Sequence, residues 1–140
     1  MTGDEMKRLV RRFYERAVAG DLGCLEEILA SDYVDHNVTT SVKGPGVARE
    51  RILGVRGAFP DLMLQVTDQI AEGDRVVSVV VARGTHTGEW RGIPPTGRTI
   101  DMKGINIDRI AGGRIVEHWG HADLLGILVQ LGVDPLGERG

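Results

Sequence analysis

The sequence lacks the features that mark several large classes of protein. It has one cysteine, Cys24, in 140 residues, so no disulfide can form within the chain, as is usual in a reducing compartment. No apolar run approaches the roughly 20 residues that a membrane-spanning helix needs. The first ten residues, MTGDEMKRLV, are charged and contain no signal-peptide core. Together these absences predict a cytoplasmic protein.

An excess of positive charge is also missing. The chain has 17 Lys and Arg against 20 Asp and Glu, a formal net charge of −3. We therefore expect no nucleic-acid partner, because binding to phosphates depends on a basic surface. The content of 41% hydrophobic and 26% charged residues is typical of a folded globular protein. At this length we expect a single domain spanning residues 1–140.

The first part of the chain has the spacing of helices. Apolar residues recur every three or four positions over residues 4–19, and Thr2 with Glu5 has the spacing of a capping box. A second helix is predicted over residues 21–29, capped by the aspartate at its start. A third is predicted over residues 45–59, where a proline occupies the first helical position.

After Leu62 the apolar period changes from about 3.6 to two, which predicts strands. Four are expected, at residues 62–70, 76–85, 99–110 and 114–121, and Gly112-Gly113 is a hairpin signal between the last two. A short helix over residues 123–131 ends at Gly132, with Pro135 beyond it. Helices followed by an antiparallel meander predict an α+β domain, with helices on one face of a curved sheet.

The last hairpin predicts a pocket. If Gly112 and Gly113 are the two turn residues, Asn106 lies opposite Trp119, and Met102 and His121 lie on the same face as both. Polar groups among apolar walls are typical of a small-molecule site. The remaining members of this face are Gly104, Asp108, Ile110, Ile115, Glu117 and Asp123, of which Asp108 and Glu117 are expected to be solvated near the turn. A slip of one residue would exchange the two faces of a strand.

The other face of this hairpin is mainly aliphatic and has no helix left to cover it. It carries Ile105, Ile107, Val116, His118 and Gly120 in this register. An uncovered apolar sheet face needs a partner. We therefore expect a homo-oligomer, a dimer formed through the sheet.

Several motifs give the chain a family resemblance. They are GTHTG at residues 84–88, GIPPT at residues 92–96, and DLLG at residues 123–126 followed by QLG at residues 130–132. In these motifs the chain resembles the SnoaL-like polyketide cyclases of the NTF2-like superfamily, most strongly from Phe59 to Pro135. The resemblance implies an NTF2-like cone, in which N-terminal helices pack on a curved, mostly antiparallel sheet.

The resemblance also implies a reaction and its residues. Cyclases of this family close a ring of an aromatic polyketide by intramolecular aldol condensation, with no metal or cofactor. Their acid/base is an aspartate just before the last helix, which is Asp123 here. Some members use a histidine on the preceding long strand, where this chain has Asn106. An amide can hydrogen-bond an enolate oxygen but cannot carry a proton, so we expect His121 to take part of that role.

Asp123 has two interpretations that the spacing leaves open. In an apolar pocket, burial would raise the pKa of its carboxyl group and make it a better general base. Aspartate is also among the best helix N-caps, and Asp123 immediately precedes the last predicted helix. One side chain can do both.

The predicted substrate-binding residues combine aromatic and polar side chains. They are Tyr14, His36, Asn37, Trp90, Met102 and Trp119. Tyr14 fits either the core or the pocket, and His36 and Asn37 fit either a loop or the pocket mouth. The four histidines make no standard metal-ligand pair, so no metal site is expected.

Two classes of function remain open. One is a cofactor-free cyclase acting on an apolar aromatic small molecule. The other is a non-catalytic small-molecule-binding or hydroxylation-accessory protein that uses the same pocket.

Overall fold

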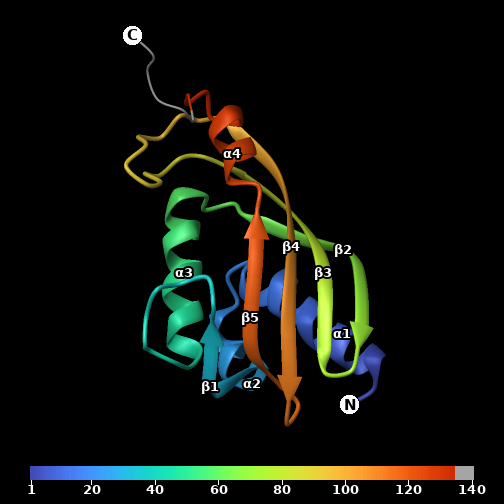
Figure 1. Cartoon of the computed structure of the whole chain (residues 1–140). Coiled ribbons are helices and arrows are strands. Elements are labelled where there is room, and N and C mark those ends of the chain that lie inside the picture. Colours follow the sequence, from blue (N-terminus) through green and yellow to red (C-terminus); the bar gives the residue numbers. More distant parts are fainter. Residues whose placement is uncertain (135–140) are drawn as a thin grey trace.

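The computed structural model describes residues 1–134, so Pro135 lies outside the described part (Figure 1). The helical elements are α1 (Gly3–Arg12), the π-helical turn η1 (Phe13–Ala17), the 3-10 turn η2 (Leu22–Cys24), α2 (Leu25–Ile28), α3 (Pro45–Ala58) and α4 (Leu124–Gln130). The strands are β1 (Leu29–Asp35), β2 (Met63–Glu72), β3 (Arg75–Thr85), β4 (Thr99–Ala111) and β5 (Arg114–Ala122). None of the helices in residues 1–134 has the length and apolar character needed to cross a membrane.

The five strands form one curved sheet in the order β1-β5-β4-β3-β2. All neighbouring strands are antiparallel except β1, which runs parallel to β5. In Figure 1, α1 and α2 lie behind the sheet, α3 lies beside β1, and α4 lies at the end of β4 and β5 away from their shared turn. This arrangement confirms the predicted α+β class and the predicted meander.

Local signals fix most of the element boundaries. The capping box forms as expected: the Glu5 amide donates to the Thr2 hydroxyl at 3.1 Å, and the Thr2 amide donates to the Glu5 carboxylate at 2.9 Å. Proline occupies the first turn of α3. The second predicted helix is wrong in its extent, because the chain turns into β1 at Leu29. That strand is stabilised by pairing with β5, about 85 residues away along the chain, which no local pattern reveals.

Two groups of buried residues make up the core. The larger packs α1, η1, α2 and α3 on the sheet and includes Val10, Phe13, Leu25, Ile28, Ile52, Val76 and Ile115. The smaller lies toward α4 and includes Ala58, Phe59, Leu62, Ala82, Ile100, Ile127 and Leu131. Val18 and Leu64 pack against both groups.

The β4–β5 hairpin departs from its predicted register at one point. Beside the turn, Ile110 pairs with Ile115 as predicted, but the register shifts by one residue between Ile110 and Arg109. Beyond this bulge Asn106 pairs with Gly120 instead of Trp119. A shift of one residue exchanges the faces of a strand. The faces of β4 are therefore as predicted, and those of β5 beyond the bulge are exchanged.

Candidate functional site

A pocket of about 570 Å³ opens between the helices and the inner face of the sheet. Its lining includes members of both core groups, so it occupies the space between them. The apolar part of the wall consists of Phe13, Val18, Tyr33, Ala48, Ile52, Val55, Phe59, Leu62, Leu64, Ala82, Trp90, Ile100, Met102, Ala122, Leu124 and Ile127. A mainly apolar cavity of this size is suited to a small organic molecule.

A cluster of three buried polar side chains lies at this pocket. The Tyr14 hydroxyl is 2.6 Å from Oδ2 of Asp108, and Nδ1 of His118 is 2.8 Å from Oδ1 of the same carboxylate. Asp108 has no exposed surface, and His118 is 7% exposed. Tyr14 and His118 line the pocket, whereas Asp108 lies behind them. Burying a carboxylate is costly unless it is hydrogen-bonded, and here both oxygens are.

The local structure explains how Tyr14 reaches the sheet. The π-helical turn η1 buries the consecutive residues Phe13 and Tyr14, whose rings meet edge to face with centroids 5.1 Å apart. Such turns are frequent at functional sites. Burial, followed by the neighbouring Asp108 carboxylate, raises the pKa of Tyr14 well above its usual range. Tyr14 is therefore a neutral donor to that carboxylate.

Gly120 leaves a gap in the inner face of the sheet. A Cβ atom there would lie 2.6 Å from Oδ1 of Asn106 and 3.0 Å from Nε2 of His118. These two polar groups thus converge over a residue that has no side chain. The backbone amide of Gly120 donates to Oδ1 of Asn37 at 2.6 Å, which holds the loop after β1 against this strand.

A second polar group lines the pocket from the helix side. Asp35, which is 6% exposed, forms an ion pair with Arg51 of α3 and accepts a 2.8 Å hydrogen bond from the Asn37 amide. Tyr33 is 1% exposed beside them. Its pKa is raised by burial first and then by the carboxylates of Asp35 and Asp108. The pocket therefore offers a cation, hydroxyl groups, amides and an imidazole.

The structure brings six of the nine predicted site residues to this pocket. They are Tyr14, Asn37, Trp90, Met102, Asn106 and His121; His121 is exposed and, beyond the bulge, pairs with Ile105 of the outer face. The other three, His36, Trp119 and Asp123, are not among the residues that line it.

The placement of His36 and Trp119 at the pocket is wrong, and for Trp119 the bulge explains why. Trp119 pairs with Ile107 on the outer face of the sheet. There its ring stacks on His36, with centroids 4.6 Å apart and an interplanar angle of 5°, and the Arg75 guanidinium lies 5.2 Å from its ring centre. Nε2 of His36 also lies 2.7 Å from the Glu117 carboxylate. These residues stabilise the outer surface.

The expectation that Asp123 lies in the wall of an enclosed cavity is also wrong. The side chain is exposed, and its Oδ1 accepts a 2.9 Å hydrogen bond from the amide of Gly126. It is thus the N-cap of α4. Its chain neighbours Ala122 and Leu124 do line the pocket, so Asp123 lies close to one end of it.

Sequence reasoning missed the buried cluster. Asp108 was expected to be solvated opposite Glu117, but it is buried opposite His118. His118 was assigned to the outer face for the same reason. A bulge after Ile115 would have placed both correctly, but nothing in the local sequence indicates it. Among residues 1–134 no three His, Cys, Asp or Glu side chains are grouped so that they could hold a metal ion.

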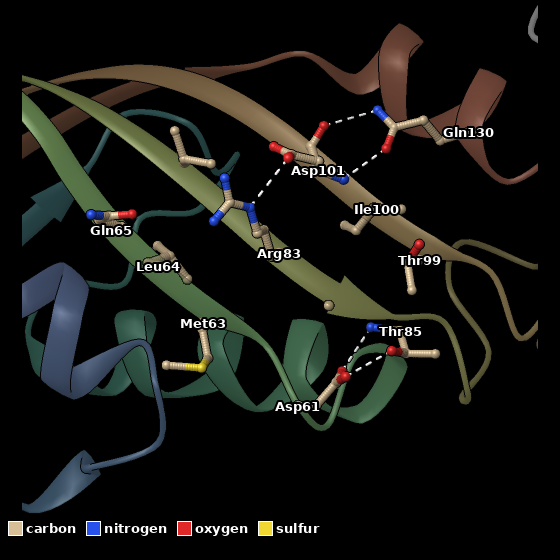
Figure 2. A pocket seen from close by; sticks show the side chains of 12 residues that line it. Asp61, Met63, Leu64, Gln65, Arg83, Thr85, Thr99, Ile100, Asp101 and Gln130 are labelled. Atoms are coloured by element: carbon tan, nitrogen blue, oxygen red, sulfur yellow. Dashed lines mark hydrogen bonds and ion pairs between the residues drawn. The ribbon is translucent and has the colours of Figure 1, made fainter.

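A second hollow of about 680 Å³ lies on the outer face of β2, β3 and β4 (Figure 2). Its polar groups pair with one another: Arg83 with Asp101 at 3.2 Å, and the Thr85 hydroxyl with Asp61 at 2.7 Å. Gln130 of α4 bonds the backbone of Asp101 in both directions. The charged side chains that line this hollow are therefore all paired with neighbouring residues.

Comparisons with known proteins show which family the chain belongs to. The sequence model described as SnoaL-like polyketide cyclase matches residues 8–131. Nogalonic acid methyl ester cyclase of Streptomyces nogalater is 31% identical, with 79% of this chain and 84% of that protein covered. Aklanonic acid methyl ester cyclase DnrD of Streptomyces peucetius is 28% identical, with 89% and 88% covered. The structure of TsrD from Streptomyces laurentii superposes with a TM-score of 0.87 at 29% identity, covering 96% of this chain and 99% of that one.

Proposed function

Because the chain belongs to the SnoaL-like polyketide cyclase family, we propose that it closes a ring of an aromatic polyketide ketone or ester by intramolecular aldol condensation. Two relatives are named as cyclases of polyketide methyl esters. The observation that carries the proposal is the inner pocket, where apolar walls surround Asn106 and the buried cluster of Tyr14, Asp108 and His118. Apolar walls fit a polycyclic substrate, and the polar groups can hold its carbonyl oxygens.

The proposed reaction needs only proton transfers. A base removes a proton from a carbon flanked by carbonyl groups, and the resulting enolate attacks a ketone within the same molecule. The alkoxide that forms then takes up a proton. We propose that no cofactor takes part, since no electrons enter or leave the substrate. Holding the flexible chain in a folded pose contributes much of the rate, as it does for other intramolecular reactions.

Asp123 is the acid/base that the family resemblance implies, and in this proposal it is the acid that protonates the alkoxide. It lies at the end of the pocket next to Leu124. His121, exposed at the same end, is the second proton-carrying group proposed there. Asn106 would stabilise the enolate oxygen through its amide, as oxyanion-hole donors do.

The test is turnover of aklanonic acid methyl ester and nogalonic acid methyl ester by the purified protein. The aldol product before loss of water has the mass of its substrate, so chromatography and the loss of one ketone carbon signal in NMR identify it. Asp123→Asn keeps an N-cap and removes the carboxylate, so turnover should fall about 10²- to 10⁴-fold. Asp101→Asn on the outer face is the matched control. A folded wild-type protein that converts neither ester would contradict the proposal.

A non-catalytic binding role is the second candidate. Two observations favour it: Asn106 stands where some family members use a histidine, and Asp123 is exposed. In that case, aromatic polyketides would quench the fluorescence of Trp90 in the pocket and would be recovered unchanged. A Trp119→Phe variant would remove the signal of the second tryptophan, which lies on the outer face.

We also propose that two copies associate through the outer face of the sheet. Met63 and Ile105 are 69% and 55% exposed on this face, and Ile107 and Val116 are half-buried. The hollow in Figure 2 adjoins this surface along β3 and β4. A dimer would remove these apolar side chains from water.

A further inference from the structure

The buried cluster of Tyr14, Asp108 and His118 places a carboxylate with no exposed surface inside the protein. Its members come from η1, β4 and β5, and Tyr14 and Asp108 are 94 positions apart in sequence. A well-packed apolar core could replace such a group without loss of stability. Its position at the pocket therefore points to a role in chemistry.

The hydrogen bonds determine which nitrogen of His118 carries the proton. The Tyr14 hydroxyl has one hydrogen, and it donates to Asp108, at 2.6 Å, in preference to Nδ1 of His118, at 3.3 Å. A carboxylate only accepts, so the 2.8 Å contact between Asp108 and Nδ1 requires a hydrogen on Nδ1. In the neutral imidazole Nε2 is then unprotonated and has a free lone pair.

The free nitrogen faces the reactive space. Nε2 of His118 and the carbonyl oxygen Oδ1 of Asn106 both lie beside Gly120, on the inner face of the sheet. All three residues line the pocket. No hydrogen-bond partner for Nε2 is present among residues 1–134. A substrate carbon in the pocket beside Gly120 could therefore meet the lone pair of Nε2.

We propose that His118 is a catalytic base of this site, with Asp108 and Tyr14 as its positioning residues. This inference rests on the proposed function. Nε2 takes a proton from the carbon between two carbonyl groups, and the electron pair of the broken C–H bond moves onto a carbonyl oxygen. The enolate carbon then bonds to the ketone carbon. The ketone oxygen becomes an alkoxide and is protonated by the Asp123 carboxyl group of the proposed function, which regains a proton from the imidazolium through water.

Asp108 acts by selecting this tautomer. An asparagine at position 108 can turn its NH₂ group toward Nδ1. Nδ1 then accepts, and the hydrogen moves to Nε2, where it blocks proton abstraction. The effect should appear in kcat while KM stays within about threefold of the wild-type value, because the walls of the pocket are unchanged. If Asp108 had a purely structural role, replacing it would lower the stability of the fold and would not change kcat separately from KM.

The experiment measures proton abstraction apart from ring closure. Methyl benzoylacetate, an aromatic β-keto ester that cannot cyclise, is incubated in D₂O with the protein, and loss of its C2 proton signal is followed by NMR. Wild type should accelerate this exchange, and His118→Gln should reduce the protein-dependent rate about 10²- to 10⁴-fold. His36→Gln, which removes an imidazole outside the pocket, is the matched control and should exchange like wild type. His118→Ala should regain activity when imidazole is added.

Each outcome decides one of the two proposals. His118 is supported as the base if the exchange is lost in both His118→Gln and Asp108→Asn while their circular dichroism stays like that of wild type. Exchange in His118→Gln at the wild-type rate, or none above the protein-free rate in wild type, overturns it. Normal exchange without ring closure of either polyketide ester overturns the cyclase and leaves the base in place.

Discussion

Replacing Gly88 with alanine tests how the loop that carries Trp90 is fixed beside the pocket. A Cβ atom at Gly88 would lie 2.0 Å from the carbonyl oxygen of Gly57 and 2.9 Å from its carbonyl carbon. Both contacts are with the backbone of α3, so no side-chain rotation can relieve them. The amides of Thr87 and Gly88 both donate to the carbonyl of Ala58 at 3.1 Å. These bonds anchor the loop to the end of the helix.

The cost follows from this geometry. An ordinary contact begins at 3.4 Å, so the loop must move by about 1.4 Å. That displacement breaks both hydrogen bonds, each worth about 1 kcal/mol, and the remaining overlap adds about 1 to 3 kcal/mol. We expect Gly88→Ala to lower the free energy of unfolding by about 3 to 5 kcal/mol. Since Trp90 moves with the loop, KM for a pocket ligand should also rise.

Urea unfolding followed by far-UV circular dichroism measures this change. Gly57→Ala is the matched control, because it lies within α3 with no atom within 4 Å of the added Cβ. There alanine should stabilise the helix by up to about 1 kcal/mol. A Gly88→Ala protein within about 1 kcal/mol of wild type would refute the close approach of loop and helix.

Three further predictions concern association and pH. Ile107→Glu should convert a dimer to a monomer on a sizing column, whereas Leu53→Glu, an exposed apolar residue on α3, should not; a dimer that survives Ile107→Glu would contradict the proposed interface. Burial raises the pKa of both tyrosines, Tyr14 and Tyr33. The ultraviolet absorption of phenolate should therefore appear only when the protein unfolds at alkaline pH. Phenolate absorption that appears near pH 10 while the chain is still folded would contradict this. The pKa of Glu117 is lowered by hydrogen bonds from its histidine and arginine neighbours, so its stabilisation is present above its ordinary pKa of 4.5 and lost as the pH falls through the lower folded value. The stability difference between wild type and Glu117→Gln in urea should therefore shrink below pH 4, and a difference independent of pH would contradict it.

Local sequence signals predict most of the elements because their causes are local. The capping box at Thr2, the proline that opens α3 and the glycine turn between β4 and β5 each lie where the pattern indicates. The strand β1 could not be predicted, since its hydrogen bonds are with β5. It follows directly after a helical segment with no Gly or Pro between them.

The candidate site was predicted only in part, for a single geometric reason. One extra residue in β5 exchanges which side chains face the pocket, so His118 replaces Trp119 there. The residues of β4, which keep their faces, were placed correctly: Met102 and Asn106 line the pocket. A bulge depends on the twist of the whole sheet and on packing against the helices. Neither can be predicted from the ten residues around the bulge.

The distance along the chain between Tyr14 and its partners has a consequence for folding. The β4–β5 hairpin closes over a two-residue turn, but Tyr14 meets Asp108 and His118 across 94 and 104 positions. Closing a loop of that length costs about 3 kcal/mol more in chain entropy than closing a tight turn. The meander can therefore form early, and the return of η1 and β1 to it is among the last folding events. Asp108 and His118 therefore lack the Tyr14 hydroxyl until η1 has packed on the sheet, so the buried cluster is completed only at that step.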